Sequence, residues 1–441
     1  MCYRLRGLTM CYLWIYLKKN GIMELKNTTI LSEGVFIMRI LIIAIVIAIA
    51  AFEFFTKYLT YSRRNAPLPE NVKDVYDEKE YQKNQAYKMD NLKFSIVTGM
   101  VSLLIGLLVL LLEIHHRLYE FITAYTTNFY LTGLFIMLVP IIVLTFIGQL
   151  LGIYDTFVIE ERYGFNKTTP RTFVIDFLKS LLIMIVIVSV LLSLFFLLYN
   201  LLGNWVFLAF FFVLLLFQLF MSFISPLMIR IFYKLTPLEE GELRDKIQEM
   251  AEKTGYKLKG IYMVDASKRS TKLNAFASGF GKTKTIGLFD TLVEKMTTDE
   301  ILFVLGHEIG HAKKGHILKT KPFSLLTFGI VLVAAYFLVT LPEVSQAFGF
   351  SDVNLAFGIY ILFIIISPLM LLLQIPGNAL SRKFEYEADA FGRELSSKEV
   401  AISALKKLYR ESLGNLTPHP FVVMIEYSHP PLSQRVDGLE K

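Results

Sequence analysis

Seven blocks of apolar residues constrain what this chain can fold into more than any other feature of its sequence. The blocks lie at approximately 38–60, 94–113, 131–152, 175–200, 205–228, 323–341 and 354–376. Each is close to the ~20 residues that a helix needs to cross the hydrocarbon core of a bilayer. Only 19% of the residues are charged, whereas about a quarter are charged in soluble domains. We therefore expect an integral membrane protein with seven membrane-spanning helices.

The basic residues of the loops predict how these helices are oriented. Two loops are rich in Lys and Arg and two are poor in them, namely 61–93 and 153–172 against 114–130 and 342–353. Loops rich in Lys and Arg stay in the cytoplasm. The basic segment 229–322 and the tail after residue 377 should therefore be cytoplasmic. Because the net charge of +7 is spread over several loops, we expect no nucleic-acid partner.

Residues 1–37 do not agree with this orientation. They carry five basic residues, which are Arg4, Arg6, Lys18, Lys19 and Lys26. With seven spans, however, they would lie on the side that is poor in basic residues. A start at Met38 removes the conflict, so we expect residues 1–37 to be an upstream misreading of the start or a processed leader. The two cysteines, Cys2 and Cys11, both lie in this stretch, so any metal must be held by His and carboxylate side chains.

Segment 229–322 is the longest stretch without a membrane span. Leu238 to Thr254 reads as an amphipathic helix that ends at Gly255. Three runs of strand character follow, at 260–264, 273–278 and 283–289, with Gly279 and Gly281 in the last turn. Thr297 then offers a hydroxyl cap to a helix with acids in its first turn. A small sheet beside a helix of this kind is typical of zincin peptidases.

That helix carries the string His307-Glu308-Ile309-Gly310-His311. Two histidines four residues apart on a helix project from one face and can hold a single metal ion. Glu308 lies where a carboxylate could take a proton from an attacking water molecule. The string alone is of moderate specificity, because a solvated helix with two surface histidines would look the same.

A catalytic zinc takes three protein ligands, and a second helix can supply the third. Glu385 and Asp389 are four residues apart and so share one face. We assign Glu385 as the third ligand and Asp389 as the acceptor that orients a ligand imidazole. Glu387 lies on another face and should be solvated. The alternative is that this segment is an ordinary charged helix without a metal ligand. The presence of the histidine pair disfavours that interpretation.

The other histidines are weaker candidates. His316 lies on a different face from His311 and reads as a helix-end residue rather than a ligand. His115 and His116 follow the second span, on the side predicted to be non-cytoplasmic. His419 lies between two prolines and reads as a loop residue. We expect no metal role for these four.

Several motifs in the same order make the chain similar to the type I CAAX prenyl protease family, the integral-membrane gluzincins. From residue 38 onward the resemblance covers nearly the whole chain. The matching segments are 157–167 (FVIEERYGFNK), 274–280 (NAFASGF), 288–292 (LFDTL), 307–311 (HEIGH), 385–389 (EYEAD) and 428–435 (SHPPLSQR). The sequence does not say whether Glu160, Glu161 and Asn166 take part in chemistry or hold a loop in shape.

The resemblance implies a mainly α fold, in which a seven-helix barrel encloses a large chamber and a small zincin-like α/β domain lies on the cytoplasmic side. It also implies that the strand at Asn274 and Ala275 offers its edge to the substrate backbone, as in strand addition. His429 would lie near the developing oxyanion and Arg435 would support the site. We divide the chain into an extension (1–37), a membrane domain with five spans (38–228) and a zinc peptidase domain with two more (229–441).

The function expected from these observations is a zinc metalloendopeptidase with one Zn²⁺ per chain. It would remove C-terminal tripeptides from prenylated CAAX proteins, and the alternative is membrane-protein quality control without prenyl specificity. A site-two-type protease is disfavoured because charged residues flank the histidine motif, and a transporter because no repeat is evident. We expect a monomer in the bacterial inner membrane or, in a eukaryote, the endoplasmic reticulum.

Overall fold

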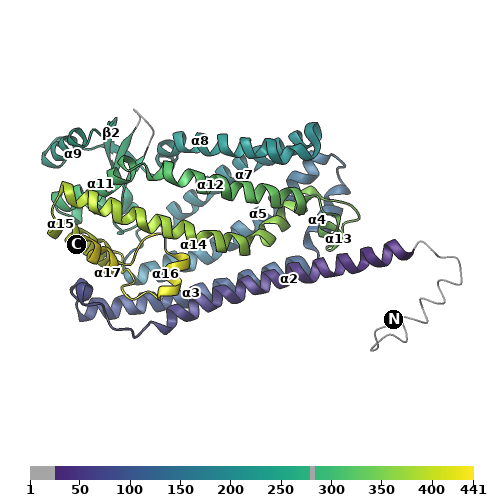
Figure 1. Cartoon of the computed structure of the whole chain (residues 1–441), viewed down its shortest axis with the longest axis horizontal. Coiled ribbons are helices and arrows are strands. Elements are labelled where there is room, and N and C mark those ends of the chain that lie inside the picture. Colours follow the sequence, from purple (N-terminus) through teal and green to yellow (C-terminus); the bar gives the residue numbers. More distant parts are fainter. Residues whose placement is uncertain (1–24, 279–283) are drawn as a thin grey trace.

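Long helices that run along one axis build most of the molecule (Figure 1). The computed structural model describes residues 25–278 and 284–441, so Cys2, Cys11 and the turn glycines Gly279 and Gly281 lie outside the described residues. The long helices are α2 (Leu25–Ser62), α3 (Glu78–Leu111), α5 (Phe129–Tyr154), α7 (Pro170–Leu202), α8 (Val206–Phe232), α12 (His316–Val339) and α14 (Leu355–Leu395). Each predicted apolar block lies on one of these seven helices.

Six helical segments of the described chain are long and apolar enough to cross a membrane. One of them, Pro170–Ile224, contains α7, a 3₁₀ turn at Gly203–Trp205 and most of α8. Gly203 has a φ of +55° there, a conformation that favours glycine. Large apolar side chains on these helices are exposed, for example Leu182, Leu216 and Phe337, as expected of helices that contact lipid.

Several helices extend beyond the predicted apolar blocks, among them α2, α3 and α14. α2 begins at Leu25, so the predicted start of the protein at residue 38 falls inside a helix. α14 continues for 41 residues to Leu395 and contains Pro368 and Pro376. The sequence analysis ended the apolar block at 376, but membrane helices tolerate proline because neighbouring groups satisfy the freed backbone. One helix therefore includes both the last apolar block and Glu385.

Shorter elements connect the long helices. At one end of the bundle lie α4 (Ile114–Thr123) and α13 (Pro342–Gln346) (Figure 1). The other short segments are η1 (Glu70–Val75), a π-helical turn η2 (Asp155–Glu160), α6 (Glu161–Tyr163) and η4 (Ala266–Lys268). The opposite end carries α9 (Glu242–Lys253), α10 (Asp290–Lys295), α11 (Thr298–Lys313), α15 (Lys398–Glu411), α16 (Pro420–Glu426) and α17 (Leu432–Glu440).

A four-stranded sheet lies at this second end, in the order β1-β2-β4-β3. The strands are β1 (Leu235–Pro237), β2 (Gly260–Val264), β3 (Ala275–Ser278) and β4 (Thr285–Phe289). β2 and β4 are parallel, and β1 and β3 are antiparallel edge strands. The sequence analysis missed β1, whose three residues end in proline. It also began the α9 helix at Leu238, although the N–H of Leu238 donates to Ile261 and extends the pairing with β2.

One apolar core joins the sheet to the helices around it. Ile286 and Leu288 of β4 pack with Phe303 and Ile309 of α11, and all four are buried. Val72, from the connection between α2 and α3, belongs to the same core. The position of α11 is therefore fixed by both halves of the chain.

Candidate metal centre

α11 carries the histidine motif, and its start is defined by a capping box. The Thr297 hydroxyl accepts from the backbone N–H of Glu300, and the Glu300 carboxylate accepts from the N–H of Thr297. This reciprocal cap satisfies two backbone donors at the helix start. It confirms the predicted cap at Thr297. The helix runs without interruption to Lys313, so His307 and His311 lie one turn apart.

Small residues bring α11 against α14. A Cβ on Gly306 would lie 3.1 Å from the Cα of Gly392, and one on Gly310 would lie 3.2 Å from the Cα of Ala388. A Cβ on Gly392 would lie 3.0 Å from the carbonyl oxygen of Phe303. The backbones of the two helices are therefore in direct contact, and this close approach places Glu385 of α14 beside the histidines.

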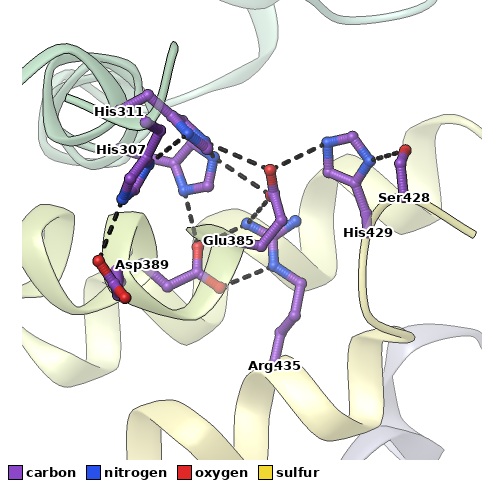
Figure 2. A network of polar contacts seen from close by, with 9 residues as sticks. His307, His311, Glu385, Asp389, Ser428, His429 and Arg435 are labelled. Carbon is purple, nitrogen blue, oxygen red and sulfur yellow. Dashed lines mark hydrogen bonds and ion pairs between the residues drawn. The ribbon is translucent and has the colours of Figure 1, made fainter. Parts of the chain in front are cut away.

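Three side chains converge at this contact (Figure 2). The Nε2 atoms of His307 and His311 are 3.1 Å apart. Oε2 of Glu385 is 3.4 Å from Nε2 of His307, and Oε1 is 3.3 Å from Nε2 of His311. One ligand atom from each of the three residues lies within 4.8 Å of the others. The structure thus brings together the three residues that the sequence analysis selected as metal ligands.

The donor set fits a zinc ion. Two imidazole nitrogens and a carboxylate oxygen are ligands that zinc accepts, and three protein ligands leave a position for water. Within the described part of the chain, Oε2 of Glu385 is buried and receives no hydrogen bond. A buried carboxylate oxygen without a donor is costly, and a cation between the three side chains would satisfy it.

Asp389 and Arg435 form a second layer behind His307 (Figure 2). Nδ1 of His307 is 2.8 Å from Oδ1 of Asp389, and Arg435 donates to both oxygens of Asp389, at 2.8 and 2.5 Å. Burial would lower the pKa of His307, but its hydrogen bond to Asp389 and the nearby carboxylate of Glu385 outweigh this effect and raise the pKa to about 9 in the metal-free protein. Arg435 is buried, and the same hydrogen bonds to Asp389 raise its pKa.

Glu308 lies between the two histidines in sequence and is half-buried. Its carboxylate makes no hydrogen bond to the described residues, so both oxygens are available to a water molecule or substrate. Burial is the main reason why the pKa of Glu308 is raised above its usual value. A carboxylate with a raised pKa is a stronger base, which suits proton transfer near neutral pH.

His429 approaches the cluster from the segment before α17. Its Nε2 atom is 3.3 Å from Oε1 of Glu385, and its Nδ1 atom is 2.9 Å from the hydroxyl of Ser428 (Figure 2). The His429 side chain is 60% exposed, so it borders the open side of the site. It is therefore accessible to a substrate.

Asn274 and Ala275 lie at the sheet edge rather than in the cluster. Asn274 is exposed, and its side-chain oxygen accepts from the N–H of Ala275 at 2.9 Å. The Ala275 side chain is buried in the core next to α11. Ala275 can therefore contribute to binding only through its backbone.

The structure confirms His316 as a helix-end residue, the first of α12, but it corrects the expected surroundings of His316 and Glu387. His316 is buried, and its Nδ1 atom lies 2.9 Å from Nδ1 of His311. Its Nε2 atom is 3.1 Å from Oε2 of Glu387, which is half-buried rather than solvated. The prediction assumed a single helix through both histidines, but α11 ends at Lys313 and Gly315 turns the chain with a φ of +67°. A glycine directly before His316 is the signal that could have revealed this turn.

The remaining histidines lie elsewhere. His115 is buried against Phe357 and Tyr360, at the end of the bundle far from α11 (Figure 1). His116 is 3.9 Å from Glu120 on the same short helix. His419 caps α16 through its Nδ1 atom.

The acidic motif before α7, which contains Glu160, Glu161 and Asn166, makes hydrogen bonds and an ion pair with other parts of the protein. Glu160 accepts from the hydroxyl of Tyr87 on α3 and pairs with Lys272 at 2.7 Å. Asn166 donates to Glu161 at 2.9 Å. The contacts of Glu160 connect the membrane helix α3 to the segment that leads into β3.

Comparisons with known proteins agree with this arrangement. Residues 57–234 match a family described as "CAAX prenyl protease N-terminal, five membrane helices", and residues 237–441 match peptidase family M48. The chain is 31% identical over 386 residues to CAAX prenyl protease 1 homolog of Oryza sativa subsp. japonica, covering 85% of this chain and 90% of that protein. It is 32% identical over 400 residues to probable CAAX prenyl protease 1 of Schizosaccharomyces pombe, covering 87% and 83%.

The fold also matches a solved structure. The crystal structure of S. mikatae Ste24p superposes with a TM-score of 0.87 at 28% sequence identity. The match covers 92% of this chain and 99% of that protein. The similarity therefore includes both the long helices and the end of the molecule that carries the metal cluster.

Proposed function

The chain belongs to the CAAX prenyl protease family of M48 peptidases, and from that premise we propose that it is a membrane-embedded, zinc-dependent metalloendopeptidase. The observation that carries this proposal is the convergence of His307, His311 and Glu385 on one point between α11 and α14. Glu308, with no hydrogen bond to the described residues, lies on the same helix.

The residues of the cluster have distinct roles in this proposal. His307, His311 and Glu385 hold one zinc ion, which when bound supplies a Lewis acid for peptide hydrolysis. Glu308 takes the proton of the attacking water and passes it to the leaving amine. Asp389 accepts from Nδ1–H of His307 and so keeps the Nε2 lone pair of that ring directed toward Glu385.

His429 is proposed as the donor to the oxyanion of the scissile carbonyl. It borders the cluster, its Nδ1 atom is engaged by Ser428, and its Nε2 atom is on the side of Glu385. Arg435 has a different position, because its guanidinium donates to Asp389 and is buried. We therefore assign Arg435 to holding Asp389 in place rather than to contact with substrate.

The proposed substrate is the C-terminus of a prenylated CAAX protein, from which a tripeptide is removed. The similar proteins from rice and fission yeast are named CAAX prenyl proteases. β3 is an edge strand, and Asn274 precedes it on the surface. An extended peptide could add to this edge through main-chain hydrogen bonds, with little demand on its side chains.

In the membrane we propose seven crossings, with α7 and α8 counted separately, that enclose a chamber. The sheet, α11 and the metal cluster then face the cytoplasm, as the distribution of Lys and Arg in the loops favours. This arrangement brings the cluster to the cytoplasmic end of the chamber, where a membrane-anchored C-terminus could enter. The protein would act as a monomer.

The test is zinc-dependent cleavage of two synthetic peptides with the same CAAX sequence, one farnesylated and one not. Purified protein in detergent should release the C-terminal tripeptide from the farnesylated peptide, and a chelator should abolish the release. Glu308→Gln should retain zinc and lose activity by a factor of at least ~100, since general-base catalysis typically contributes that much.

Different results would contradict different parts of the proposal. Equal cleavage of both peptides would argue against prenyl recognition and for a quality-control peptidase. Normal turnover by Glu308→Gln would show that another group acts as the base. A wild-type protein that binds no zinc would overturn the assignment as a metallopeptidase.

A further inference from the structure

His316 has a position that its place in the sequence does not suggest. It is the first residue of α12 and follows Gly315. The φ of +67° at Gly315 changes the direction of the backbone between α11 and α12. Its ring is 3% exposed and stacks on Phe384 of α14, with centroids 4.2 Å apart and planes 8° from parallel. A histidine is therefore held rigidly behind the metal cluster.

Both nitrogens of this ring have partners. Nδ1 lies 2.9 Å from Nδ1 of His311, and Nε2 lies 3.1 Å from Oε2 of Glu387. Lys319, one turn along α12, is 3.7 Å from the same oxygen of Glu387 and balances its charge. The side chains of His311, His316 and Glu387 thus form a continuous chain that leads away from the cluster.

The carboxylate of Glu387, at the end of this series of side chains, determines which ring nitrogens of His316 and His311 carry a hydrogen. A carboxylate only accepts hydrogen bonds, so Nε2 of His316 carries the hydrogen that it donates to Glu387. In the neutral ring, Nδ1 of His316 is then an acceptor, and among the described residues its hydrogen-bond partner is Nδ1 of His311, which must carry the hydrogen. Nε2 of His311 is left with its lone pair, which points toward Glu385 and His307.

We propose that His316 is a positioning residue of the metal site, which accepts a hydrogen bond from His311 and selects the tautomer whose Nε2 lone pair is free to bind zinc. This inference rests on the proposed function, because it assigns His311 as a ligand. His307 has an equivalent partner in Asp389. The two ligand histidines are therefore oriented by different chemical groups, one by a carboxylate directly and the other by a carboxylate through a second imidazole.

Two variants of His316 separate this role from packing. His316→Phe keeps a ring against Phe384 and removes the acceptor. We expect it to weaken zinc binding by roughly 10- to 100-fold, the usual effect of losing such a partner, without changing the thermal unfolding of the metal-free protein. His316→Asn returns an acceptor oxygen near the position of Nδ1 while losing the ring. It should bind zinc more tightly than His316→Phe, although its packing is worse.

Zinc affinity is measured by chelator competition on the full-length protein in detergent, so the readout does not depend on activity. Leu318→Ala is the control, because Leu318 lies on the same turn of α12 and is 68% exposed, and it should bind zinc like wild type. Equal weakening by His316→Phe and His316→Asn, or no weakening by His316→Phe, would overturn the proposal.

Glu387→Ala decides the matter if the His316 variants do not fold. Glu387 is half-buried at the surface of α14, so its removal should be tolerated. Without this acceptor, His316 can place its hydrogen on either nitrogen, so zinc affinity should fall below that of the wild type, by less than the ~10-fold expected for complete loss of the partner of His311. An unchanged affinity would contradict the proposal, whereas a wild-type protein that binds no zinc would contradict the metallopeptidase function itself.

Discussion

The candidate metal site and the residues behind it form a set of charged side chains that compensate one another. Asp389 lies between His307 and Arg435, and Arg435 is also 3.9 Å from Glu385. Removing one member of a buried ion pair leaves an uncompensated charge, which costs more than the pair itself contributes. Residues behind the ligands should therefore matter for folding as well as for metal binding.

Arg435→Met tests this dependence. The variant leaves Asp389 buried with only His307 as a partner, so we expect the free energy of unfolding to fall by about 3 kcal/mol. Thermal unfolding in detergent measures the change. Arg393→Met is the control, because Arg393 lies on α14 and, among the described residues, donates to a backbone carbonyl of α17, that of Leu439, rather than to a carboxylate. It should cost about 1 kcal/mol, and an equal loss in both variants would argue against a special role for the buried pair.

The sequence was sufficient to select His307, His311 and Glu385, because a spacing of four residues places the two histidines on one face of their helix, and the same spacing places Glu385 and Asp389 on one face of another. The position of His316 could not be predicted in this way. It depends on a turn at Gly315 and on the packing of α12 against α14, and neither follows from helical spacing. For Ala275, the alternation along a strand does not say which side is buried against α11.

Among the elements, the contact between α11 and α14 determines the distance between the ligands. Gly306 and Gly310 on α11 face Ala388 and Gly392 on α14, and none of the four has a side chain larger than a methyl group. Cβ atoms at the glycines would meet backbone atoms, which cannot move aside as the end of a flexible side chain can. The helices can therefore be this close only with small residues at these positions.

Gly392→Leu should separate the two helices. Its Cβ would lie 3.0 Å from the carbonyl oxygen of Phe303 and 3.1 Å from the amide nitrogen of His307. Overpacking of this kind costs about 1–3 kcal/mol, and we expect zinc affinity to fall roughly tenfold or more as Glu385 moves away. In the control Gly329→Leu, the Cβ of Gly329 on α12 meets no atom within 4 Å. Loss of zinc by both variants, or by neither, would contradict this account.

The start of α11 gives a prediction about pH. Glu300 is buried and accepts hydrogen bonds from Thr297, Ser403 and Lys407. Burial alone would raise the pKa of Glu300, but these hydrogen bonds outweigh it and hold the pKa below the usual value. A carboxyl whose pKa is lowered by folding stabilises the protein at neutral pH, and this contribution is lost as the pH falls through the folded-state pKa.

Glu300→Ala should therefore lower the unfolding temperature at pH 7, with a loss of about 2–3 kcal/mol for the buried hydrogen bonds. The difference from wild type should shrink as the pH falls through the lowered pKa of Glu300, where the wild-type carboxyl becomes protonated. Glu300→Gln retains an acceptor and should have an intermediate effect. A difference that does not depend on pH would show that packing rather than charge is responsible.

The sequence predicted most elements correctly, and the failures have physical reasons. Strands β2, β3 and β4 were expected within two residues of their bounds, because alternating apolar residues and flanking glycines mark them. β1 was missed because a strand of three residues is too short to show the alternation of apolar and polar residues by which a strand is identified. The end of α14 was misplaced because the apolar block stops at 376, whereas the helix continues with a buried face against α11.

On the scale of the whole molecule, the two halves of the chain share one core. The connection between α2 and α3 enters the core around α11, where Val72, Val75 and Tyr76 are buried. The hydroxyl of Tyr76 donates to the backbone carbonyls of Tyr409 and Gly414. The membrane half therefore stabilises the half that carries the metal cluster.

Tyr76→Ala should destabilise the whole protein by about 3–5 kcal/mol, as expected for truncation of a buried aromatic side chain. Tyr76→Phe keeps the ring and loses the hydroxyl, so its cost should be about 1–2 kcal/mol. Thermal unfolding monitored at the metal site would show whether α11 is affected. Tyr58→Ala, at a side chain that is 64% exposed on α2, is the control and should change little.

The length of α14 has a consequence for how the enzyme depends on its lipid surroundings. With 41 residues, the helix is about 60 Å long, whereas the hydrocarbon layer is ~30 Å thick. When a bilayer is thinner or thicker than the apolar part of a helix, the helix tilts to accommodate the mismatch. Glu385 lies near the C-terminal end of α14, beyond the apolar part of the helix. A tilt of the helix would therefore displace Glu385 more than residues near the middle of the bilayer. A tilt of α14 relative to α11 would thus change the distance between Glu385 and the two histidines.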